Sequence, residues 1–403
     1  MDEIRQLEVR EISEQLWDVV VVGGGPAGAI CARVLANRGH RVLVVDKHRF
    51  PRHKACGDLL IPDSLTVLDR QGLLEQVSDN AVHLSNIHVF SPSQVDLKVA
   101  GHYLGLSRFD LDALLIRRAI DEGVAFARGS VCGVETSPDK PARLKLAGSP
   151  ETLECQIVVL ATGADIEIPH KLQMIDQPAA SAIAIRQYVR SSFELPDIVL
   201  SYDRCLLPGY AWLIPLGDGR YNVGCGVRLD QGDGRAPNLK KMLREFFDSF
   251  PLARKLMAEV TESSRIAGAA LRCGLIGCRR IVHDNMVLAG ETIGTTFPFT
   301  GEGIGKAMHT GELAARAVSQ ALNDGDLSRL AAYPEAVARE IEPHYEGYFQ
   351  AERWLSRPRL NDFVARRARK SRYLRGELET FIAETGDPRS AFGLGGIIKS
   401  FWK

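Results

Sequence analysis

The sequence predicts an α/β protein that combines a parallel sheet, an inserted antiparallel sheet and a helical carboxy-terminal end. A nearly continuous β-branched run at residues 17–22 precedes a glycine turn and a helical stretch, which is typical of a parallel strand buried on both faces. Residues 182–185 and 221–227 alternate at period two, as expected of antiparallel strands. Beyond residue 350, leucines and charged residues follow helical spacing.

The length of 403 residues suits two closely connected domains. We expect residues 1–77, 101–168 and 264–350 to form a Rossmann-like dinucleotide-binding domain. Residues 78–100 and 169–263 would form a substrate domain inserted into it, and residues 351–403 a helical cap.

The composition excludes several classes of function. The chain has 50 basic residues (Lys and Arg) and 50 acidic residues (Asp and Glu), so its formal net charge is zero. A neutral chain gives no overall electrostatic reason to bind nucleic acid. The eight cysteines lack the spacing of a zinc site, and we expect no metal. No apolar run approaches the roughly 18 residues of a membrane span, and residues 1–15 are too charged for a signal peptide. These features predict a cytoplasmic protein.

The carboxy-terminal region is locally basic, in contrast to the balanced whole. Arginines and a lysine crowd residues 353–375, and the apolar residues Ile397, Ile398, Phe401 and Trp402 follow. Two interpretations stay open. The region is either a solvated helical face that closes over the rest of the protein, or a surface that contacts a membrane peripherally.

The glycine turn of residues 23–28 has the context of a dinucleotide site. Gly23 permits a tight turn, Gly25 allows close approach of a pyrophosphate, and Gly28 allows the following helix to pack on the sheet. That helix is expected to end at Gly39. The next strand ends in Asp46, whose carboxylate can accept hydrogen bonds from ribose hydroxyls and would repel a 2′-phosphate. FAD or NAD is therefore favoured over NADP.

A second glycine-rich junction lies late in the chain. A short apolar strand at residues 285–289 leads into residues 290–305, and a helix is expected over about 302–322. Such a junction presents backbone N–H groups and a helix dipole to an electron-rich group. An isoalloxazine ring is such a group, which favours FAD over NAD.

These segments together resemble the paired FAD motifs of the flavoprotein hydroxylase and geranylgeranyl reductase superfamily. Glu291 stands where that superfamily usually has Asp, so its carboxylate reaches one methylene further toward the ribityl chain. Residues 107–115 resemble the helix whose arginine, here Arg108, meets the cofactor; a surface pairing of Arg108 with Asp110 or Asp112 is the alternative. The resemblance implies cofactor contacts from Gly23, Gly25, Ala27, Gly28, Asp46, Lys47, Cys56, Gly57, Arg108, Ala161, Gly163, Glu291, Pro298, Gly301, Gly303 and Ile304.

Two further segments resemble the geranylgeranyl reductase family in particular. One is the loop at residues 50–58, which contains Lys54-Ala55-Cys56-Gly57; the other is the strand at residues 210–215, backed by residues 222–227. Period two places Tyr210, Trp212 and Ile214 on one face, where they would line a substrate pocket. Asp58 departs from the resemblance, because many relatives have glycine there.

The resemblance implies an FAD-dependent oxidoreductase that reduces carbon–carbon double bonds of a hydrophobic, isoprenoid-like substrate by hydride transfer from reduced FAD. Cys56, Tyr210 and Trp212 are the candidate catalytic residues, with Cys56, Tyr210 or an ordered water as the proton donor. A simple packing role for Cys56 is the alternative. No second complete glycine-turn unit is found, so the reductant would be transiently bound NAD(P)H or an electron-donor protein.

Other functions remain open. Flavin-dependent halogenases share a Pro-Arg-His loop, here residues 51–53, and a Trp-x-Ile-Pro strand end, here residues 212–215. They also need a lysine between flavin and substrate; Lys54 lies in a different motif, and Lys98 is the other candidate. An aromatic hydroxylase, or monooxygenase, shares the cofactor motifs but not the Lys-x-Cys-Gly loop. An FAD-binding carrier without catalysis is the alternative from a different class.

Overall fold

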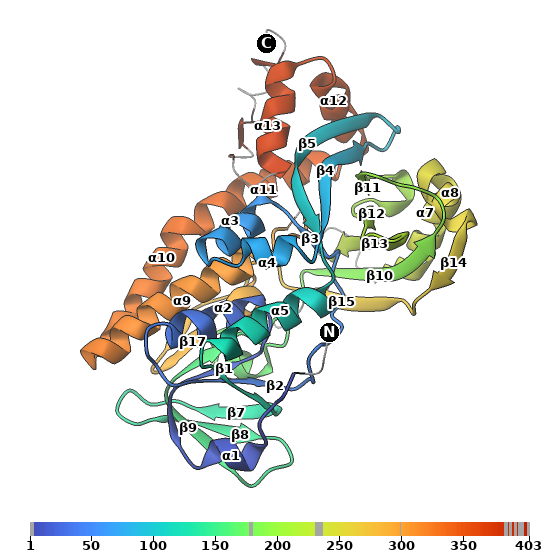
Figure 1. Ribbon diagram of the computed structural model, residues 1–403. Helices are drawn as coiled ribbons and strands as arrows, with labels where there is room; N and C mark the ends of the chain where they lie inside the picture. Colours follow the sequence, from blue (N-terminus) through green and yellow to red (C-terminus); the bar gives the residue numbers. More distant parts are fainter. Residues whose placement is uncertain are drawn as a thin grey trace.

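The computed structural model describes residues 4–176, 180–229, 237–298, 300–382, 386, 389–390, 393 and 399–400. It confirms the predicted α/β architecture of two sheets and a helical cap (Figure 1). The apolar residues Ile397, Ile398, Phe401 and Trp402 lie outside the described residues. Within the described part, no helix is both long and apolar enough to cross a membrane.

The first sheet has a parallel centre in the order β17, β9, β1, β2, β6. These strands are β1 (Leu16–Val22), β2 (Val42–Asp46), β6 (Ala125–Arg128), β9 (Thr152–Leu160) and β17 (Met286–Leu288). The short β16 (Val282–His283) extends one edge, and β7 (Val131–Glu135) and β8 (Ala142–Leu146) form an antiparallel extension beside β9. Val19 to Val21 are fully buried, as the β-branched run predicts for a central parallel strand.

Helices α2 (Pro26–Ala36), α5 (Arg108–Asp121) and α9 (Ile304–Asp324) pack together on one side of this sheet (Figure 1). The chain leaves α2 at Gly39, which has a φ of +86°. Residue 311 of α9 is a glycine whose Cβ would lie 2.2 Å from the Ala27 carbonyl oxygen. The close contact between α2 and α9 brings the amino-terminal ends of both helices toward the second sheet. Shorter helices complete this part: α1 (Val9–Ser13), α3 (Pro62–Arg70), α4 (Leu74–Ser78), α6 (Glu167–Lys171) and α10 (Ala332–Glu340).

The second sheet runs in the order β14, β10, β13, β12, β11, β4, β5, β3, with β15 also paired to β10. Its strands are β3 (Leu59–Leu60), β4 (Val82–Phe90), β5 (Asp96–Gly105), β10 (Ala182–Ser191), β11 (Ile198–Ser201), β12 (Tyr210–Pro215), β13 (Arg220–Arg228), β14 (Val260–Ser263) and β15 (Ala267–Leu271). The β4 and β11 pair is parallel, unlike the antiparallel pairing expected throughout. Between them the chain crosses the first sheet, and such long crossovers permit parallel pairing.

The domain boundaries stay a prediction. β3 and β15 pair with the second sheet, although their residues fall in ranges assigned from sequence to the dinucleotide-binding domain. A division drawn by strand pairing would therefore move both into the substrate domain.

The two faces of the second sheet have different partners. Val223 and Cys225 face the helices α7 (Leu239–Ser249) and α8 (Pro251–Ala258), where Phe246 and Phe250 complete a small core. In the register of the strands, Arg186 of β10 lies opposite Gly224 of β13, which lies opposite Trp212 of β12. The other face, with Tyr210, Trp212 and Ile214, is thus turned toward the first sheet.

The cap consists of α11 (Glu342–Leu355), α12 (Pro358–Ala368) and α13 (Arg372–Ile382), and it packs against both halves of the protein (Figure 1). The Tyr345 hydroxyl donates to the Thr295 carbonyl at 2.6 Å, and the Tyr348 ring stacks on Phe297 at 3.9 Å. Glu352 forms a buried ion pair with Arg228 of β13, with 3.0 Å between Oε1 and Nε. The cap therefore joins the late glycine-rich loop to the second sheet.

We expect Gly28→Ala to destabilise the protein by about 3 kcal/mol or more, because a Cβ at this position would lie 1.9 Å from the Gly23 carbonyl oxygen. Gly376→Ala is the matched control, since that helical glycine has open space around its Cβ position, and it should be neutral or slightly stabilising. Chemical denaturation of both variants measures the difference. Equal stability of the two variants would contradict the crowding at residue 28.

Candidate functional site

A single large cavity of about 630 Å³ lies between the two sheets and the cap. It brings together every site residue expected from sequence except Gly28, whose place is in the packing of α2 against the turn. The lining residues among those expected are Gly23, Gly25, Ala27, Asp46, Lys47, Cys56, Gly57, Arg108, Ala161, Gly163, Tyr210, Trp212, Ile214, Glu291, Pro298, Gly301, Gly303 and Ile304. Their individual roles stay predictions.

The glycine turn forms one end of the cavity. Gly23 has a φ of +105°, and a Cβ there would lie 2.3 Å from the Ala161 carbonyl oxygen, so only glycine fits. At Gly25 the nearest atom to a Cβ would be the Arg52 guanidinium, 3.6 Å away. Gly25 begins α2 without a side-chain cap, which leaves backbone N–H groups facing the cavity. This end of the site can bind an anion.

Asp46 lies at the end of β2 beside the turn. Its carboxylate accepts the Gly24 N–H and the His48 N–H, both at 2.8 Å, and its side chain lines the cavity. These bonds fix the carboxylate while leaving lone pairs for further donors. Lys47 follows it and pairs with Asp165 at 2.8 Å, where both side chains are half exposed.

Two arginines flank the turn and share one carboxylate. Arg108 Nε and Nη2 bind the two oxygens of Asp112 at 2.6 and 2.8 Å, and Arg52 Nη2 binds Asp112 at 3.0 Å. Arg108 thus pairs with Asp112, as one interpretation expected, but inside the protein and not on its surface. Burial alone would raise the pKa of Asp112, but the two arginines lower it by more. The net pKa of Asp112 is therefore below its usual value, and the carboxyl stays ionised. The net positive charge of this cluster suits a pyrophosphate.

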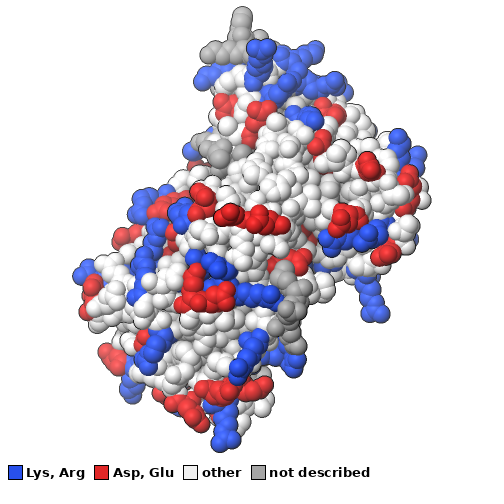
Figure 2. All heavy atoms as spheres, viewed as in Figure 1, with Lys and Arg blue, Asp and Glu red and all other residues white. Residues whose placement is uncertain are grey.

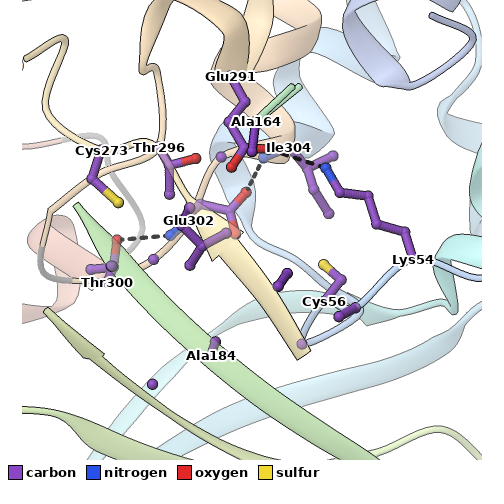
Figure 3. A pocket seen from close by; sticks show the side chains of 18 of the residues that line it. Lys54, Cys56, Ala164, Ala184, Cys273, Glu291, Thr296, Thr300, Glu302 and Ile304 are labelled. Carbon is purple, nitrogen blue, oxygen red and sulfur yellow. Dashed lines mark hydrogen bonds and ion pairs between the residues drawn. The ribbon is translucent and has the colours of Figure 1, made fainter. Parts of the chain in front are cut away.

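Glu291 lies at the start of the late glycine-rich segment and follows Gly290, whose Cβ position is 2.7 Å from the Ala27 Cβ. Its carboxylate accepts Lys54 Nζ at 3.1 Å (Figure 3). It also accepts the Arg272 backbone N–H at 3.3 Å. The Lys54 and Glu291 side chains both approach Gly163, with its φ of +68°. The pair therefore ties the Cys56 loop to the turn that follows β9.

Glu302 caps the amino-terminal end of α9. Its Oε1 accepts the Ile304 N–H at 3.0 Å and its own N–H donates to Thr300 Oγ1 at 3.3 Å (Figure 3). Burial, with the nearby Asp63 carboxylate, raises the pKa of Glu302 to about 7. Glu302 was not predicted from the sequence as a site residue; its position two residues before the helix start was the available signal.

Asp58 fixes the conformation of the Cys56 loop through buried hydrogen bonds. The residue is fully buried with a φ of +62°, a conformation that glycine adopts freely. Its carboxylate accepts the Arg108 N–H at 3.0 Å, the Tyr188 hydroxyl at 2.6 Å and Asn222 Nδ2 at 2.8 Å. Burial raises the pKa of Asp58 despite these hydrogen bonds. The three donors hold the aspartate in a conformation that it rarely adopts.

Asn222 connects this loop to the aromatic wall. Its Nδ2 also donates to the Cys56 carbonyl at 2.7 Å, and its Oδ1 accepts the Trp212 Nε1–H at 2.9 Å. The indole is thereby fixed over the sheet, and its N–H is already engaged. Asn222 was expected on a strand, and no pattern in the sequence predicted its contacts.

The two candidate proton donors differ in availability. Burial and the nearby Asp58 raise the pKa of the Cys56 thiol to about 11, so the thiol keeps its proton at neutral pH. Burial also raises the pKa of Tyr210, whose hydroxyl donates to the Thr300 carbonyl. Cys56 lines the cavity, and the Glu302 carboxylate is near enough to contribute to the raised pKa of its thiol (Figure 3).

The arrangement fits FAD. The cavity extends from Asp46, past the uncapped start of α2 and the arginine cluster, to the loop of residues 296–304 and the wall of β12. The cap closes the far end with residues that the sequence analysis did not identify, namely Asn361, Val364, Ala365, Leu378, Phe381 and Ile382. The dinucleotide end is therefore charged and the opposite end is largely apolar.

Comparison with known proteins agrees with this geometry. The family described as FAD binding domain matches residues 17–342. The menaquinone reductase of Mycobacterium tuberculosis is 29% identical over 327 residues, which cover 78% of each chain. The digeranylgeranylglycerophospholipid reductase of Methanoculleus marisnigri is 25% identical over 340 residues, which cover 79% of this chain and 80% of that protein.

Two solved structures share the fold. A geranylgeranyl bacteriochlorophyll reductase-like protein from Thermoplasma acidophilum matches with a TM-score of 0.76 over 96% of both chains, at 19% identity. The flavin-dependent brominase Bmp2 matches with a TM-score of 0.76 over 96% of this chain and 98% of its own, also at 19% identity. At this identity both matches concern the fold alone.

We expect Asp112→Asn to weaken FAD retention and to cost about 3–5 kcal/mol of stability, because it leaves two buried arginines without their shared carboxylate. Asp165→Asn is the control, since its half-exposed pair with Lys47 should contribute no more than about 1 kcal/mol. The FAD content after gel filtration and the denaturation midpoint report both effects. Full FAD content and an unchanged midpoint in Asp112→Asn would refute the assigned role.

Glu302 predicts a pH dependence of the FAD-free protein. Its folded pKa of about 7 exceeds the usual 4.5, so the folded state binds more protons and loses stability as pH rises from about 4.5 through 7. Glu302→Gln should reduce the loss of unfolding free energy between pH 5 and pH 8 by up to about 3 kcal/mol. Urea denaturation of both proteins at pH 5 and pH 8 tests this, and an identical pH dependence would contradict it.

Proposed function

We propose that this chain, which belongs to the FAD binding domain family, reduces carbon–carbon double bonds of a hydrophobic, isoprenoid-like substrate. FAD is its cofactor, and the chain is an FAD-dependent oxidoreductase. The observation that carries the proposal is the continuity of one cavity from the dinucleotide end to an apolar wall. That wall includes Trp212, Ile214, Val364, Leu378 and Phe381.

FAD, when bound and reduced, supplies the hydride for such a reaction. The chain provides orientation, exclusion of water and the proton that balances the addition across the double bond. The Cys56 thiol is the proton donor in this proposal, since it is neutral and lines the cavity. Tyr210 is a poorer donor because its hydroxyl is bonded to the Thr300 carbonyl, and it serves to hold that loop.

The reducing equivalents come from outside the chain. The reductant in this proposal is NAD(P)H or an electron-donor protein, which restores the two electrons after each addition. The relatives named menaquinone reductase and digeranylgeranylglycerophospholipid reductase support a substrate with an isoprenoid chain.

A flavin-dependent halogenase, or a monooxygenase, is the second candidate. The strand end Trp212-Leu213-Ile214-Pro215 and the fold shared with brominase Bmp2 favour it. The positions of the two candidate lysines argue against a halogenase. Lys54 is bound to Glu291, and Lys98 pairs with Asp197 and is absent from the cavity lining found among the described residues.

The test of function is product analysis. Purified FAD-loaded protein, reduced anaerobically with dithionite, is offered geranylgeranyl compounds, and a parallel reaction supplies oxygen, halide and an aromatic substrate. We expect products that gain two hydrogens per reduced bond. A halogenated or hydroxylated product would overturn the proposal, as would flavin reduction without any turnover, which is the result expected of a carrier.

Cys56→Ser should lower turnover about 100-fold while FAD content stays unchanged, because the serine hydroxyl is a weaker acid than the thiol. Cys132→Ser is the control, since Cys132 is exposed and is not among the residues found to line the cavity in the described part of the chain. Single-turnover reoxidation of the flavin by substrate gives the rate of the step. Full turnover in Cys56→Ser would show that the proton comes from another group.

We also propose that the cap contacts a membrane surface. Basic side chains gather over α12 and the turn to α13 (Figure 2), where Arg359, Arg366, Arg369, Lys370 and Arg372 are exposed. None of these five forms an ion pair with another described residue. Phe363, 39% exposed, lies among them, while Val364 and Ala365 on the same helix line the cavity. One helix thus offers cations to anionic lipid and an apolar side to the substrate chain.

Co-sedimentation with vesicles tests this contact. We expect binding to vesicles with phosphatidylglycerol but not to phosphatidylcholine alone, and roughly tenfold or more weaker binding in the double variant Arg366→Gln with Lys370→Gln. Lys240→Gln with Lys255→Gln, on exposed positions of α7 and α8, is the matched control. Equal binding of both double variants would contradict a cap-mediated contact.

A further inference from the structure

Arg186 is a buried cation that forms no ion pair with another described residue. It lies on β10, is 4% exposed and lines the cavity. Its guanidinium lies over the Tyr188 ring, 3.9 Å from the ring centroid, and its Nε has no hydrogen-bond partner. No carboxylate or carbonyl oxygen among the described residues binds this guanidinium.

One acidic group, Asp58, lies close enough to Arg186 to sense its charge, but it already accepts three other donors. Its two oxygens accept the Arg108 N–H, the Tyr188 hydroxyl and Asn222 Nδ2, and it forms no ion pair with Arg186. Tyr188 therefore connects Asp58 and Arg186, since its hydroxyl donates to Asp58 and its ring stacks against the Arg186 guanidinium.

Each of the other arginines that line the cavity has a carboxylate partner. Arg228, on the neighbouring strand, pairs with Glu352, while Arg52 and Arg108 share Asp112. A guanidinium keeps its charge at any physiological pH, and burying it without a partner is unfavourable. Stacking on Tyr188 offsets part of this cost but leaves the N–H groups without acceptors.

We propose that Arg186 binds an anionic oxygen group of the substrate, a carboxylate or a phosphate at the end of its apolar chain. This inference rests on the proposed function and deepens it, because it adds a charged head to the hydrophobic substrate. A planar guanidinium held against a ring presents its edge, which matches two oxygens of such a group.

Arg186 comes from a different part of the fold than the groups proposed to bind the cofactor's own phosphates. The pyrophosphate end of the site is formed by the start of α2 with Arg52 and Arg108, on the side of the first sheet. Arg186 belongs to the second sheet, at the level of Gly224 and Trp212. The substrate would therefore lie along the aromatic wall with its head at β10.

Equilibrium binding to the FAD-loaded protein tests the inference without requiring turnover. The probes are geranylgeranyl phosphate, geranylgeranoic acid and the uncharged geranylgeraniol, each followed by the change in flavin absorbance. We expect at least one of the two anions to bind tenfold or more tightly than the alcohol. The relative affinity of the phosphate and the acid identifies which head group fits.

Variants assign the preference to the residue. Arg186→Met should bring the affinity of the anions to that of the alcohol while the alcohol binds within twofold of wild type, and Arg186→Lys should keep part of the preference. Arg190→Met, an exposed position on the same strand, is the matched control and should behave as wild type. Arg186→Lys also keeps the test valid where Arg186→Met fails to fold.

Three results would overturn the inference: no preference for anions in the wild type, an unchanged preference in Arg186→Met, or loss of FAD from a folded Arg186→Met, which would make the cofactor the partner. Reduction of geranylgeraniol, measured separately, distinguishes the two proposals. Turnover of the alcohol without anion preference removes only the role of Arg186. Anion binding through Arg186 without any reduction removes the proposed function.

Discussion

The close approach of α2 to the strand before it is the constraint on which the site depends. Without side chains at residues 23 and 28, the backbone of the turn touches the carbonyls of residues 161 and 23, and the helix begins within the cavity. The same helix end faces two arginines that Asp112 keeps in place. A backbone geometry available only to glycine thus aligns the helix dipole, the guanidinium groups and Asp46 along one channel.

The cavity that results has a strong gradient of polarity. Its dinucleotide end is built from ionised groups that satisfy one another, and its far end from aromatic and aliphatic side chains of β12 and the cap. Between them lies the buried polar cluster of Asp58, Tyr188 and Asn222, whose hydrogen bonds fix the Cys56 loop and the Trp212 indole. Such a fully bonded cluster favours one arrangement of the loop over others, since every alternative would leave buried polar groups unsatisfied.

The parts predicted from sequence are those whose signal is contiguous. The strand, glycine turn and helix of residues 17–38 and the period-two strand of residues 210–215 each carry their pattern within a few residues, and both form as expected. The partners that complete the site are distant in the chain. Asn222 meets Asp58 across 164 positions, and no local pattern indicates that contact. In the alternating pattern of its strand, Arg186 resembles a polar residue that faces solvent. Only the packing of the second sheet against the rest of the protein places it inside the cavity.

The cap makes the cofactor site and the proposed substrate site parts of one mechanical unit. Tyr345 and Tyr348 of α11 hold the loop of residues 295–297, and one turn further along the same helix Glu352 holds Arg228 of the second sheet. A displacement of α11 therefore disturbs both sites together. By thermodynamic reciprocity, any ligand that steadies α11 from the substrate side strengthens FAD binding by the same factor that FAD strengthens the binding of that ligand.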